Sequence, residues 1–313
     1  MVARLASLLA AFCVIALPAW AQPASDSLPF KLTEVGPGVY AAIGGPRAGS
    51  NAGFVVGDDG VLVIDSFFSA DAAGALLGEI RKVTPKPIRY VVNTHYHIDH
   101  VSGDAVFKAA GATIIAHRNV PGWIHPENIH LMGGDRIRPE YKAQIDQLID
   151  PDRTIDQPTD LRLGKRRVEL LPMTGHTGGD LAVFIPDAHV AFAGDILWNH
   201  VAPTTIDGKI IAWTADLGRL KALPGAAVFV PGHGEIAAAT DVQDMIAFFQ
   251  DLVRLTQAAR KAGLSGDALA KDVAPKLAAL HPDWDRIARI APELATEMDQ
   301  ELAGTKRVPV PAP

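Results

Sequence analysis

The stretch Thr94-His95-Tyr96-His97-Ile98-Asp99-His100 decides the fold, because its three imidazoles and one carboxylate directly follow a predicted strand over 88–93 that contains Val91-Val92. Two adjacent valines are typical of a buried strand. Side chains two residues apart in an extended chain share a face, so His95 and His97 point the same way. Nitrogen and oxygen ligands at this spacing indicate a metal site, and Asp99 with His100 can serve a second metal beside it.

The composition is that of a globular protein that can bury a large core. The chain has 313 residues, of which 48% are hydrophobic and 20% charged. This length predicts one large domain, or one domain with a helical annex. A net charge of -6 argues against a basic surface for nucleic acid, so we expect no nucleic-acid partner. The single Cys13 excludes a disulfide-stapled fold.

The N-terminus has the pattern of a cleaved secretory signal peptide, residues 1–21. Arg4 precedes an apolar run over residues 5–17, and Ala19-Trp20-Ala21 is a small-x-small cleavage pattern. The run is shorter than the roughly 20 residues that span a bilayer, and no second run of that length follows, so we expect no stable membrane insertion. The prediction is a periplasmic or secreted protein, cleaved near Ala21.

Short apolar runs bounded by Gly, Pro and Asp alternate with helical patterns, which predicts a mixed α/β architecture. The predicted strands are 39–43, 53–56, 61–64, 88–93, 113–116, a hairpin over 161–172 turning at Gly164, 181–185, 189–193 and 228–230. Asp58-Asp59-Gly60 predicts a hairpin turn between the second and third of them. The predicted helices between them are 70–82, 101–110 and 211–223.

Two stretches depart from this alternation. Residues 119–152 are rich in Pro and Gly and predict a long irregular insertion, either a lid or a tolerated surface excursion. From Thr240 the chain reads as helix, so we expect a main domain over 29–239 and a helical extension over 240–304 packed on it. Thr240 and Gln243 fit a capping box, and a helix is expected over 282–303. Residues 305–313 are expected to be disordered.

Three further candidates lie at predicted strand exits, each in a glycine-flanked turn. They are His176 in Thr174-Gly175-His176-Thr177-Gly178-Gly179-Asp180, Asp195 in Ala193-Gly194-Asp195, and His233 in Pro231-Gly232-His233-Gly234. Any one of these turns alone is common. Their value is joint, because ligands must come from several strand ends to enclose two metals.

In the order and spacing of these motifs, from about Val35 to His233, the chain resembles the metallo-β-lactamase-fold hydrolases. Their signature reads His-x-His-x-Asp-His, then Gly-His, then Gly-Asp or Gly-Cys, then Gly-His. The resemblance implies an αβ/βα four-layer sandwich with a dinuclear site at one edge between the sheets. It implies a first metal on His95, His97 and His176, and a second on Asp99, His100 and His233. Asp195 would bridge the two metals.

The resemblance also implies a chemistry. Two cations about 3.5 to 4 Å apart hold a bridging hydroxide that attacks a carbonyl carbon, while the metals stabilise the oxyanion and the leaving group. Asp99 both ligates and orients the hydroxide, which gives it a catalytic role; its loss should harm turnover more than metal content. Two Zn²⁺ ions are the expected cofactor, and Fe²⁺ or Mn²⁺ also suit these ligands.

The aspartate at position 195 narrows the range of functions that the resemblance implies. Many β-lactamases of this fold carry Cys there and a Lys three residues later, where this chain has Trp198. Flavodiiron reductases favour Glu in place of His97, and glyoxalase II acts on a cytosolic thioester, which conflicts with an export signal. The expected function is an exported hydrolase of a small ester, lactone, thioester or amide. The alternatives are a β-lactamase and a non-catalytic metal-binding or quinoprotein-relay-associated protein.

Substrate contacts are less well indicated than the metal ligands. The candidates flank the ligand positions and either line the pocket or pack structurally: Tyr96, Trp198, Asn199 and His200. Trp123 and Met132 of the insertion are further candidates for capping the pocket. The remaining histidines His117, His189 and His281 are expected to be structural or solvated.

Overall fold

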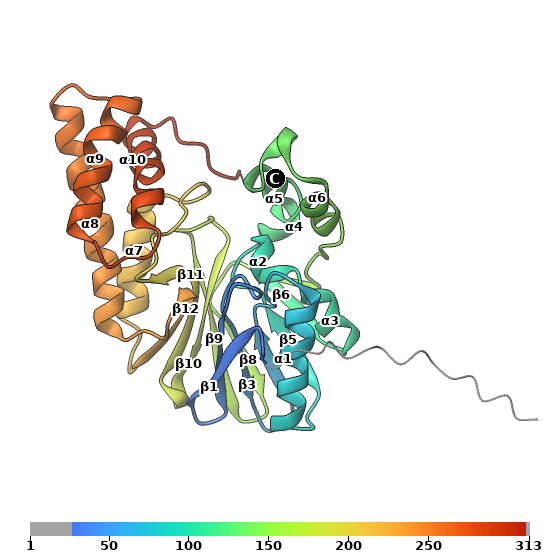
Figure 1. Cartoon of the computed structure of the whole chain (residues 1–313). Coiled ribbons are helices and arrows are strands. Elements are labelled where there is room, and N and C mark those ends of the chain that lie inside the picture. The colour runs from blue at the N-terminus through green and yellow to red at the C-terminus, as the bar shows by residue number, and fades with distance from the viewer. Residues whose placement is uncertain (1–26, 311–313) are drawn as a thin grey trace, which may run out of the picture.

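The computed structural model describes residues 27–310, in which two β-sheets lie face to face with helices outside them (Figure 1). The predicted signal peptide lies outside the described residues. Within the described part, no helix is long and apolar enough to cross a membrane. The two facing sheets with helices outside them confirm the α/β sandwich that is expected from the sequence.

The first sheet has seven strands in the order β1-β2-β3-β4-β5-β6-β7. They are β1 (Phe30–Gly36), β2 (Val39–Gly44), β3 (Ala52–Val56), β4 (Val61–Ile64), β5 (Ile88–Val92), β6 (Thr113–His117) and β7 (Arg153–Ile155). The strands from β1 to β4 pair antiparallel, and those from β4 to β7 pair parallel. The predicted turn at Asp58-Asp59-Gly60 joins the antiparallel pair β3 and β4, as expected.

The second sheet has five strands in the order β12-β11-β10-β9-β8. They are β8 (Thr159–Leu163), β9 (Arg166–Met173), β10 (Asp180–Ile185), β11 (Val190–Asn199) and β12 (Val228–Gly234). The predicted hairpin forms between β8 and β9, and Gly164 in its turn has a left-handed φ of 66°. β11 and β12 pair in parallel with two shifts of register around Gly194.

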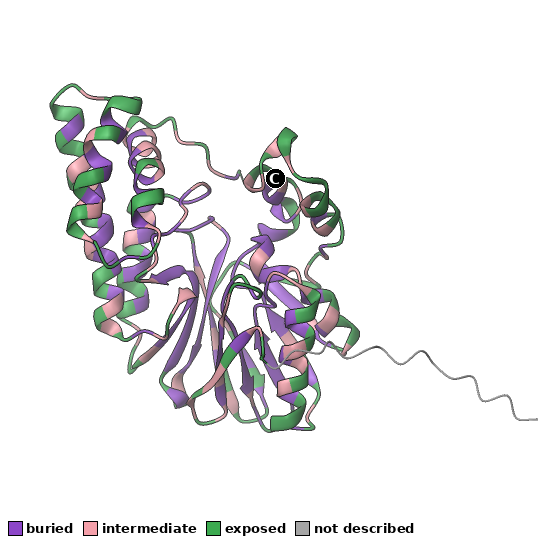
Figure 2. Cartoon of the chain, viewed as in Figure 1, coloured by how far each residue is buried: buried purple, intermediate pink, exposed green. Residues whose placement is uncertain are grey.

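Helices lie outside both sheets and at one end of the sandwich (Figure 1). They are α1 (Ala70–Val83), α2 (Ile98–Val101), α3 (Asp104–Ala109), α4 (Val120–Trp123), α5 (Pro126–Leu131), α6 (Pro139–Ile145), α7 (Ile210–Lys221), α8 (Ala239–Lys261), α9 (Gly266–Leu280) and α10 (Ile287–Ala303), with 3-10 turns η1 (Gly134–Arg136) and η2 (Pro186–Ala188). Apolar side chains of both sheets form the central core, and α1 and α3 pack outside the first sheet. Helices α7 and α8 pack outside the second sheet, and α9 and α10 pack on α8. This is a four-layer arrangement, with its buried strands visible in Figure 2.

Several local expectations are corrected by the structure. Strands β1 and β7 were not predicted, and the helix expected over 101–110 is two short helices separated at Gly103. A Cβ on Gly103 would lie 2.2 Å from the Ser66 carbonyl oxygen, so the chain passes too close there for another residue. The last helix begins at Ile287 rather than at residue 282. Helix α8 is capped by Asp241, which accepts from the Ala238 N–H at 2.7 Å, and not by Thr240 with Gln243.

The insertion over 119–152 is not irregular, because it folds into α4, α5, η1 and α6. These helices pack on α2 through an apolar cluster that includes Tyr96, Val101 and Trp123. In Figure 1 the insertion (green) and the C-terminal helices (orange to red) stand on either side of the same end of the sandwich.

Residues 305–310, hereafter the C-terminal strap, run from α10 to the insertion (Figure 1). The Lys306 ammonium donates to the Thr205 carbonyl at 2.7 Å and pairs with Glu297. Arg307 pairs with Glu127 of α5 at 2.6 Å, and the Trp123 indole donates to the Val310 carbonyl at 2.8 Å. The expectation of disorder is therefore wrong for these residues, and residues 311–313 lie outside the described part.

Candidate metal centre

The candidate residues come from four loops and strand ends at one edge of the sandwich. His95 and His97 follow β5, and His176 lies between β9 and β10. Asp195 lies within β11 and His233 within β12. Gly194 has a left-handed φ of 52°, and a Cβ there would lie 2.5 Å from the Thr94 side chain, so only glycine lets β11 approach the loop after β5.

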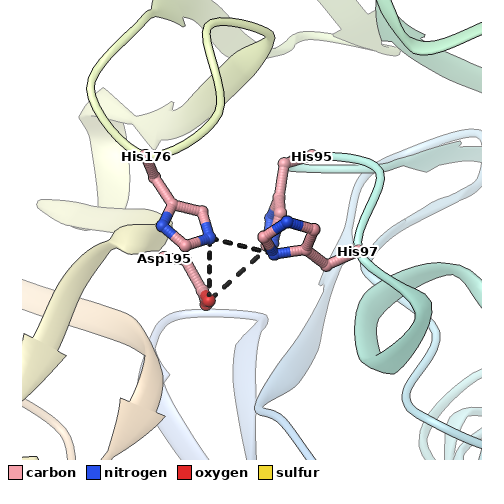
Figure 3. A group of neighbouring side chains, drawn as sticks. All are labelled: His95, His97, His176 and Asp195. Atoms are coloured by element: carbon pink, nitrogen blue, oxygen red, sulfur yellow. Dashed lines mark hydrogen bonds and ion pairs between the residues drawn. The ribbon is translucent and has the colours of Figure 1, made fainter. Parts of the chain in front are cut away.

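A first group gathers His95, His97, His176 and Asp195, all buried, with one ligand atom of each within 4.8 Å of the others (Figure 3). His97 Nδ1 lies 3.0 Å from His176 Nε2. Asp195 Oδ2 lies 3.3 Å from His176 Nε2 and 3.7 Å from His95 Nε2. The four atoms come together from two loops and strand β11.

A second group gathers Asp99, His100 and His233. Asp99 Oδ2 lies 3.3 Å from His233 Nε2 and 3.8 Å from His100 Nε2. Asp195 lies between the two groups, because its Oδ1 is 3.1 Å from His100 Nε2 and its Oδ2 is 3.5 Å from His233 Nε2. The structure thus brings together all seven residues singled out from the sequence as ligands.

The donor set fits divalent metal ions. Within the described residues, several buried ring nitrogens and a carboxylate oxygen lack any hydrogen-bond partner, among them His95 Nε2, His100 Nε2 and Asp195 Oδ1. An unpaired buried polar atom costs about 1 to 3 kcal/mol, so a cluster of them facing one another needs a ligand to satisfy it. Imidazole nitrogens and carboxylate oxygens are ligands of Zn²⁺, Fe²⁺ and Mn²⁺ alike.

Charge and burial set the protonation of these groups. Burial raises the pKa of Asp195, but the neighbouring His233 and His100 hold this pKa well below its ordinary value. Burial lowers the pKa of His176 to about 3 and also lowers that of His95. Against the effect of burial, Asp195 raises the pKa of His233 to about 9. A metal ion at the second group would bind the neutral ring of His233, so its binding would depend on pH.

Two aspartates that the sequence analysis missed orient the candidate ligands. Asp65 Oδ2 lies 2.8 Å from His100 Nδ1, and the same carboxylate accepts from the N–H and hydroxyl of Thr94. Asp207 Oδ2 lies 3.0 Å from His97 Nε2. Partners of this kind fix the ring orientation and the tautomer of a metal-binding histidine. Asp65 had a detectable signal, since it directly follows a buried strand, whereas Asp207 lies in a loop without any pattern.

A pocket of ≈ 520 Å³ opens onto the two groups. Its walls include His97, Asp99, Asp195 and His233, with Phe68, Leu131 and Met132 on one side and Arg286, Arg289 and Glu293 on the other. A larger pocket of ≈ 710 Å³ lies between α9 and α10, but it contains none of the candidate ligands. The insertion and the C-terminal helices therefore both contribute walls to the pocket over the candidate metal centre.

The four residues expected to contact substrate are placed differently from one another. Trp198 lines the pocket and stacks on His233, with ring centroids 3.9 Å apart. Tyr96 is fully buried and donates its hydroxyl to Asp207 at 2.5 Å. Asn199 donates to the Glu235 carbonyl, and His200 faces Trp284, Asp241 and Asp244 on the outside of the molecule. Only Trp198 of the four is a wall of this pocket.

Of the insertion residues, Met132 lines the pocket as expected. Trp123 instead packs against Tyr96 beneath it, with ring centroids 5.8 Å apart.

A family model described as "Metallo-beta-lactamase superfamily" matches residues 45–233, which is more than half of the chain. The chain therefore belongs to the metallo-beta-lactamase superfamily. The match spans every candidate ligand and ends on His233.

Curated relatives and solved structures show what the chain is similar to. A hydroxyacylglutathione hydrolase of Brucella anthropi is 28% identical over 145 residues, covering 46% of this chain and 46% of the relative. A linear primary-alkylsulfatase of a Pseudomonas species is 23% identical over 230 residues, covering 62% of this chain and 43% of the relative. The chain thus spans about half the length of the curated relatives it matches.

Two solved structures share the fold at 20% identity. The sec-alkylsulfatase Pisa1 from a Pseudomonas species has a TM-score of 0.68 and covers 88% of this chain and 50% of its own. A metallo-beta-lactamase from Pontibacter korlensis has a TM-score of 0.56 and covers 71% of this chain and 99% of its own.

Proposed function

We propose that the chain is a metal-dependent hydrolase with two divalent ions, zinc by default, that acts on a small ester, lactone, thioester or amide. One observation carries the proposal: two groups of ligand atoms share Asp195 and open into a pocket of ≈ 520 Å³. Superfamily membership and the hydrolase names of the relatives support it. His95, His97 and His176 would hold one ion, Asp99, His100 and His233 the other, and Asp195 both.

Bound divalent ions supply Lewis acidity and activate a water molecule as the nucleophile. The chain's own residues do the positioning. Asp99 lines the pocket with its side chain 24% exposed, so its carboxylate is open to the attacking water and can accept its proton. Asp195 also lines the pocket but is only 3% exposed, and its two oxygens face the two groups of ligands, which it would serve together. Trp198 beside His233 supplies a flat apolar wall against the substrate.

A sulfate ester is the second candidate substrate. The relative named as a linear primary-alkylsulfatase matches a larger share of this chain, 62%, than the hydroxyacylglutathione hydrolase, 46%. The same arrangement of ligands can present water to sulfur or to a carbonyl carbon. The assay with each kind of substrate therefore decides which bond the protein hydrolyses.

We also propose that the protein is exported to the periplasm or secreted after cleavage near Ala21. Arg4, the apolar run over 5–17 and the Ala19-Trp20-Ala21 pattern support this. Mass spectrometry of the protein recovered after expression in a Gram-negative host should give an N-terminus at Gln22. An intact Met1 on the recovered protein would contradict export by this route.

The function is tested by assaying the zinc-loaded mature chain on a panel of chromogenic compounds. The panel holds an activated ester, a lactone, a thioester, a sulfate ester and a β-lactam. We expect turnover of at least one carbonyl compound, with Asp99→Asn lowering kcat roughly 100-fold. Asp272→Asn, which removes a carboxylate from an exposed ion pair on α9, is the matched control and should keep full activity.

The panel also separates the alternatives. Turnover of the sulfate ester alone would assign the second candidate, and efficient β-lactam turnover would make the protein a β-lactamase. A chain with two bound zinc ions that hydrolyses nothing in the panel would support a non-catalytic, relay-associated protein and reject the proposal.

A further inference from the structure

The wall of the pocket that α10 forms carries two arginines with no anion to pair with. Arg286 immediately precedes α10, and Arg289 lies in its first turn. Both line the pocket that contains Asp99 and His233. Within residues 27–310, neither guanidinium makes an ion pair or a side-chain hydrogen bond. Arginines that line a pocket without any counter-ion are suited to a ligand that brings one.

Arg286 is held close to the candidate metal centre. Its Cζ lies 5.6 Å from the centroid of the Trp198 ring, and that ring stacks on His233. The Trp198 ring therefore contacts both the Arg286 guanidinium and the candidate ligand His233. Its Nε is buried without a partner, and so is the indole Nε1 of Trp198, whose side chain is only 3% exposed. Two buried donors at the same wall lack an acceptor.

The electrostatics of this wall favour an incoming anion. Burial, and then the like charge of Arg289, lower the pKa of Arg286, so its positive charge is poorly compensated by the protein. Glu293 is the acidic residue on the same wall. Burial raises the pKa of Glu293, and it forms no ion pair within 4 Å with either arginine among the described residues. The protein itself therefore leaves the two guanidinium groups short of negative charge.

The opposite wall is apolar. Phe68 follows β4, while Leu131 and Met132 come from the insertion. A compound that fits the pocket would lay an apolar portion on this side, its reacting bond over the metal centre and an anionic end on the arginines.

We propose that the substrate carries an anionic oxygen group, a carboxylate or a sulfate, which Arg286 and Arg289 bind from the N-terminal end of α10. This rests on the proposed function and names its substrate class. A guanidinium presents a planar pair of N–H donors that matches two oxygens of either group. The two arginines determine specificity, whereas the hydrolysis itself remains the work of the metal centre and Asp99.

The test compares two esters that differ by one charge, p-nitrophenyl butyrate and the p-nitrophenyl monoester of glutaric acid. The zinc-loaded wild type should prefer the charged ester in kcat/KM. Arg286→Gln and Arg289→Gln should each lower this preference roughly tenfold, through KM rather than kcat. Arg81→Gln removes an exposed charge from α1 that has no ion pair among residues 27–310, and it should keep the wild-type preference. Inorganic sulfate and acetate are compared as competitive inhibitors of the charged ester, and stronger inhibition by sulfate that the double Arg286→Gln, Arg289→Gln variant loses would identify sulfate as the preferred anion.

A second variant guards against misfolding. Arg286 has a left-handed φ of 64°, which glycine adopts without strain, so Arg286→Gly should fold at least as stably as Arg286→Gln and still lose the preference. A double Arg286→Gln, Arg289→Gln variant that keeps the wild-type preference would overturn the inference while leaving the proposed function intact.

Binding by calorimetry separates the inference from the function if neither ester reacts. Butyrate offers one carboxylate for the metal ions, and glutarate offers a second for the arginines. Wild type should bind glutarate more tightly than butyrate, and the double variant should bind the two equally. Equal binding of both acids to wild type would reject the anion site, whatever the outcome of the activity assays.

Discussion

At the scale of single residues, Gly232 limits how the two groups of candidate ligands can be built. A Cβ placed on Gly232 would lie 1.8 Å from Asp195 Oδ1, the carboxylate between the groups. The φ of Gly232 is not left-handed, so the contact alone, and not backbone strain, requires glycine. The close approach of β12 to β11 thus positions Asp195.

We predict that Gly232→Ala lowers the zinc content of the purified chain, because the new methyl group must displace the Asp195 carboxylate. Gly78→Ala is the control, since a Cβ there meets nothing within 4 Å and lies inside α1. The control should keep its zinc and gain up to about 1 kcal/mol of stability from the helix propensity of alanine. Equal zinc in wild type and Gly232→Ala, measured by mass spectrometry of the metals, would contradict the account.

A buried carboxyl group outside the candidate centre gives a pH prediction. Asp104 Oδ1 accepts hydrogen bonds from Ser66 and Asn93, at 2.7 and 3.0 Å, and its Oδ2 has no partner among the described residues. Burial raises the pKa of Asp104 to about 7. The unfolded chain releases this proton near pH 4 and the folded chain only near pH 7. The group therefore costs no stability below pH 4, and its cost grows as the pH rises to 7.

We expect wild type to lose about 4 kcal/mol relative to Asp104→Asn between pH 4 and pH 8. Asparagine cannot ionise, and the titrations that both proteins share cancel in the difference. Denaturant unfolding at several pH values measures this difference. A difference that stays constant with pH would show that Asp104 titrates normally in the fold.

At the scale of elements, the C-terminal strap connects two parts of the fold that are far apart in sequence. Lys306 joins it to the loop at Thr205, and Arg307 joins it to α5 through Glu127. Arg307 also lies 3.8 Å from Asp207, which holds His97. The strap thus stabilises the insertion that forms one wall of the pocket.

Deleting residues 306–313 should lower Tm by about 5 °C, since the lost hydrogen bonds and ion pairs together contribute about 2 kcal/mol. Glu127→Gln is the milder comparison, because it weakens one ion pair and keeps the rest of the strap. Its Tm should fall by a smaller amount. A truncated chain that melts at the wild-type temperature would mean that the strap contributes nothing to stability.

Most elements follow from sequence periodicity, and those that do not have identifiable reasons. Strands β3, β4 and β5 are near-continuous apolar runs and were located to within a residue or so. The sequence does not predict the helices of the insertion, because proline usually interrupts a helix. Here Pro121, Pro126 and Pro139 all lie in the first turn of a helix, where proline is favoured.

The ligand residues were easier to predict than their surroundings. Glycine-flanked histidines and aspartates at strand ends carry a local pattern. Asp207, Arg286 and Arg289 carry none, because their place at the pocket depends on how distant segments pack. The strap contacts could not be predicted for the same reason.

At the scale of the whole molecule, two sheets provide the candidate metal centre and two peripheral segments provide the pocket. The sheet edges supply ligands from β11, β12 and the loops that follow β5 and β9. The insertion supplies an apolar wall, and α10 supplies a charged one. The sandwich thus supports the chemistry, while the added segments select what it acts on.

The central claim is that these residues hold two metal ions, and the metal-to-protein ratio of zinc-equilibrated chain tests it most directly. We predict two zinc ions per wild-type chain, about one after His97→Ala or His233→Ala, and fewer than one after Asp195→Asn, because that carboxylate serves both groups. A wild-type chain that binds no zinc, or variants that bind as much as wild type, would contradict the assignment of these ligands.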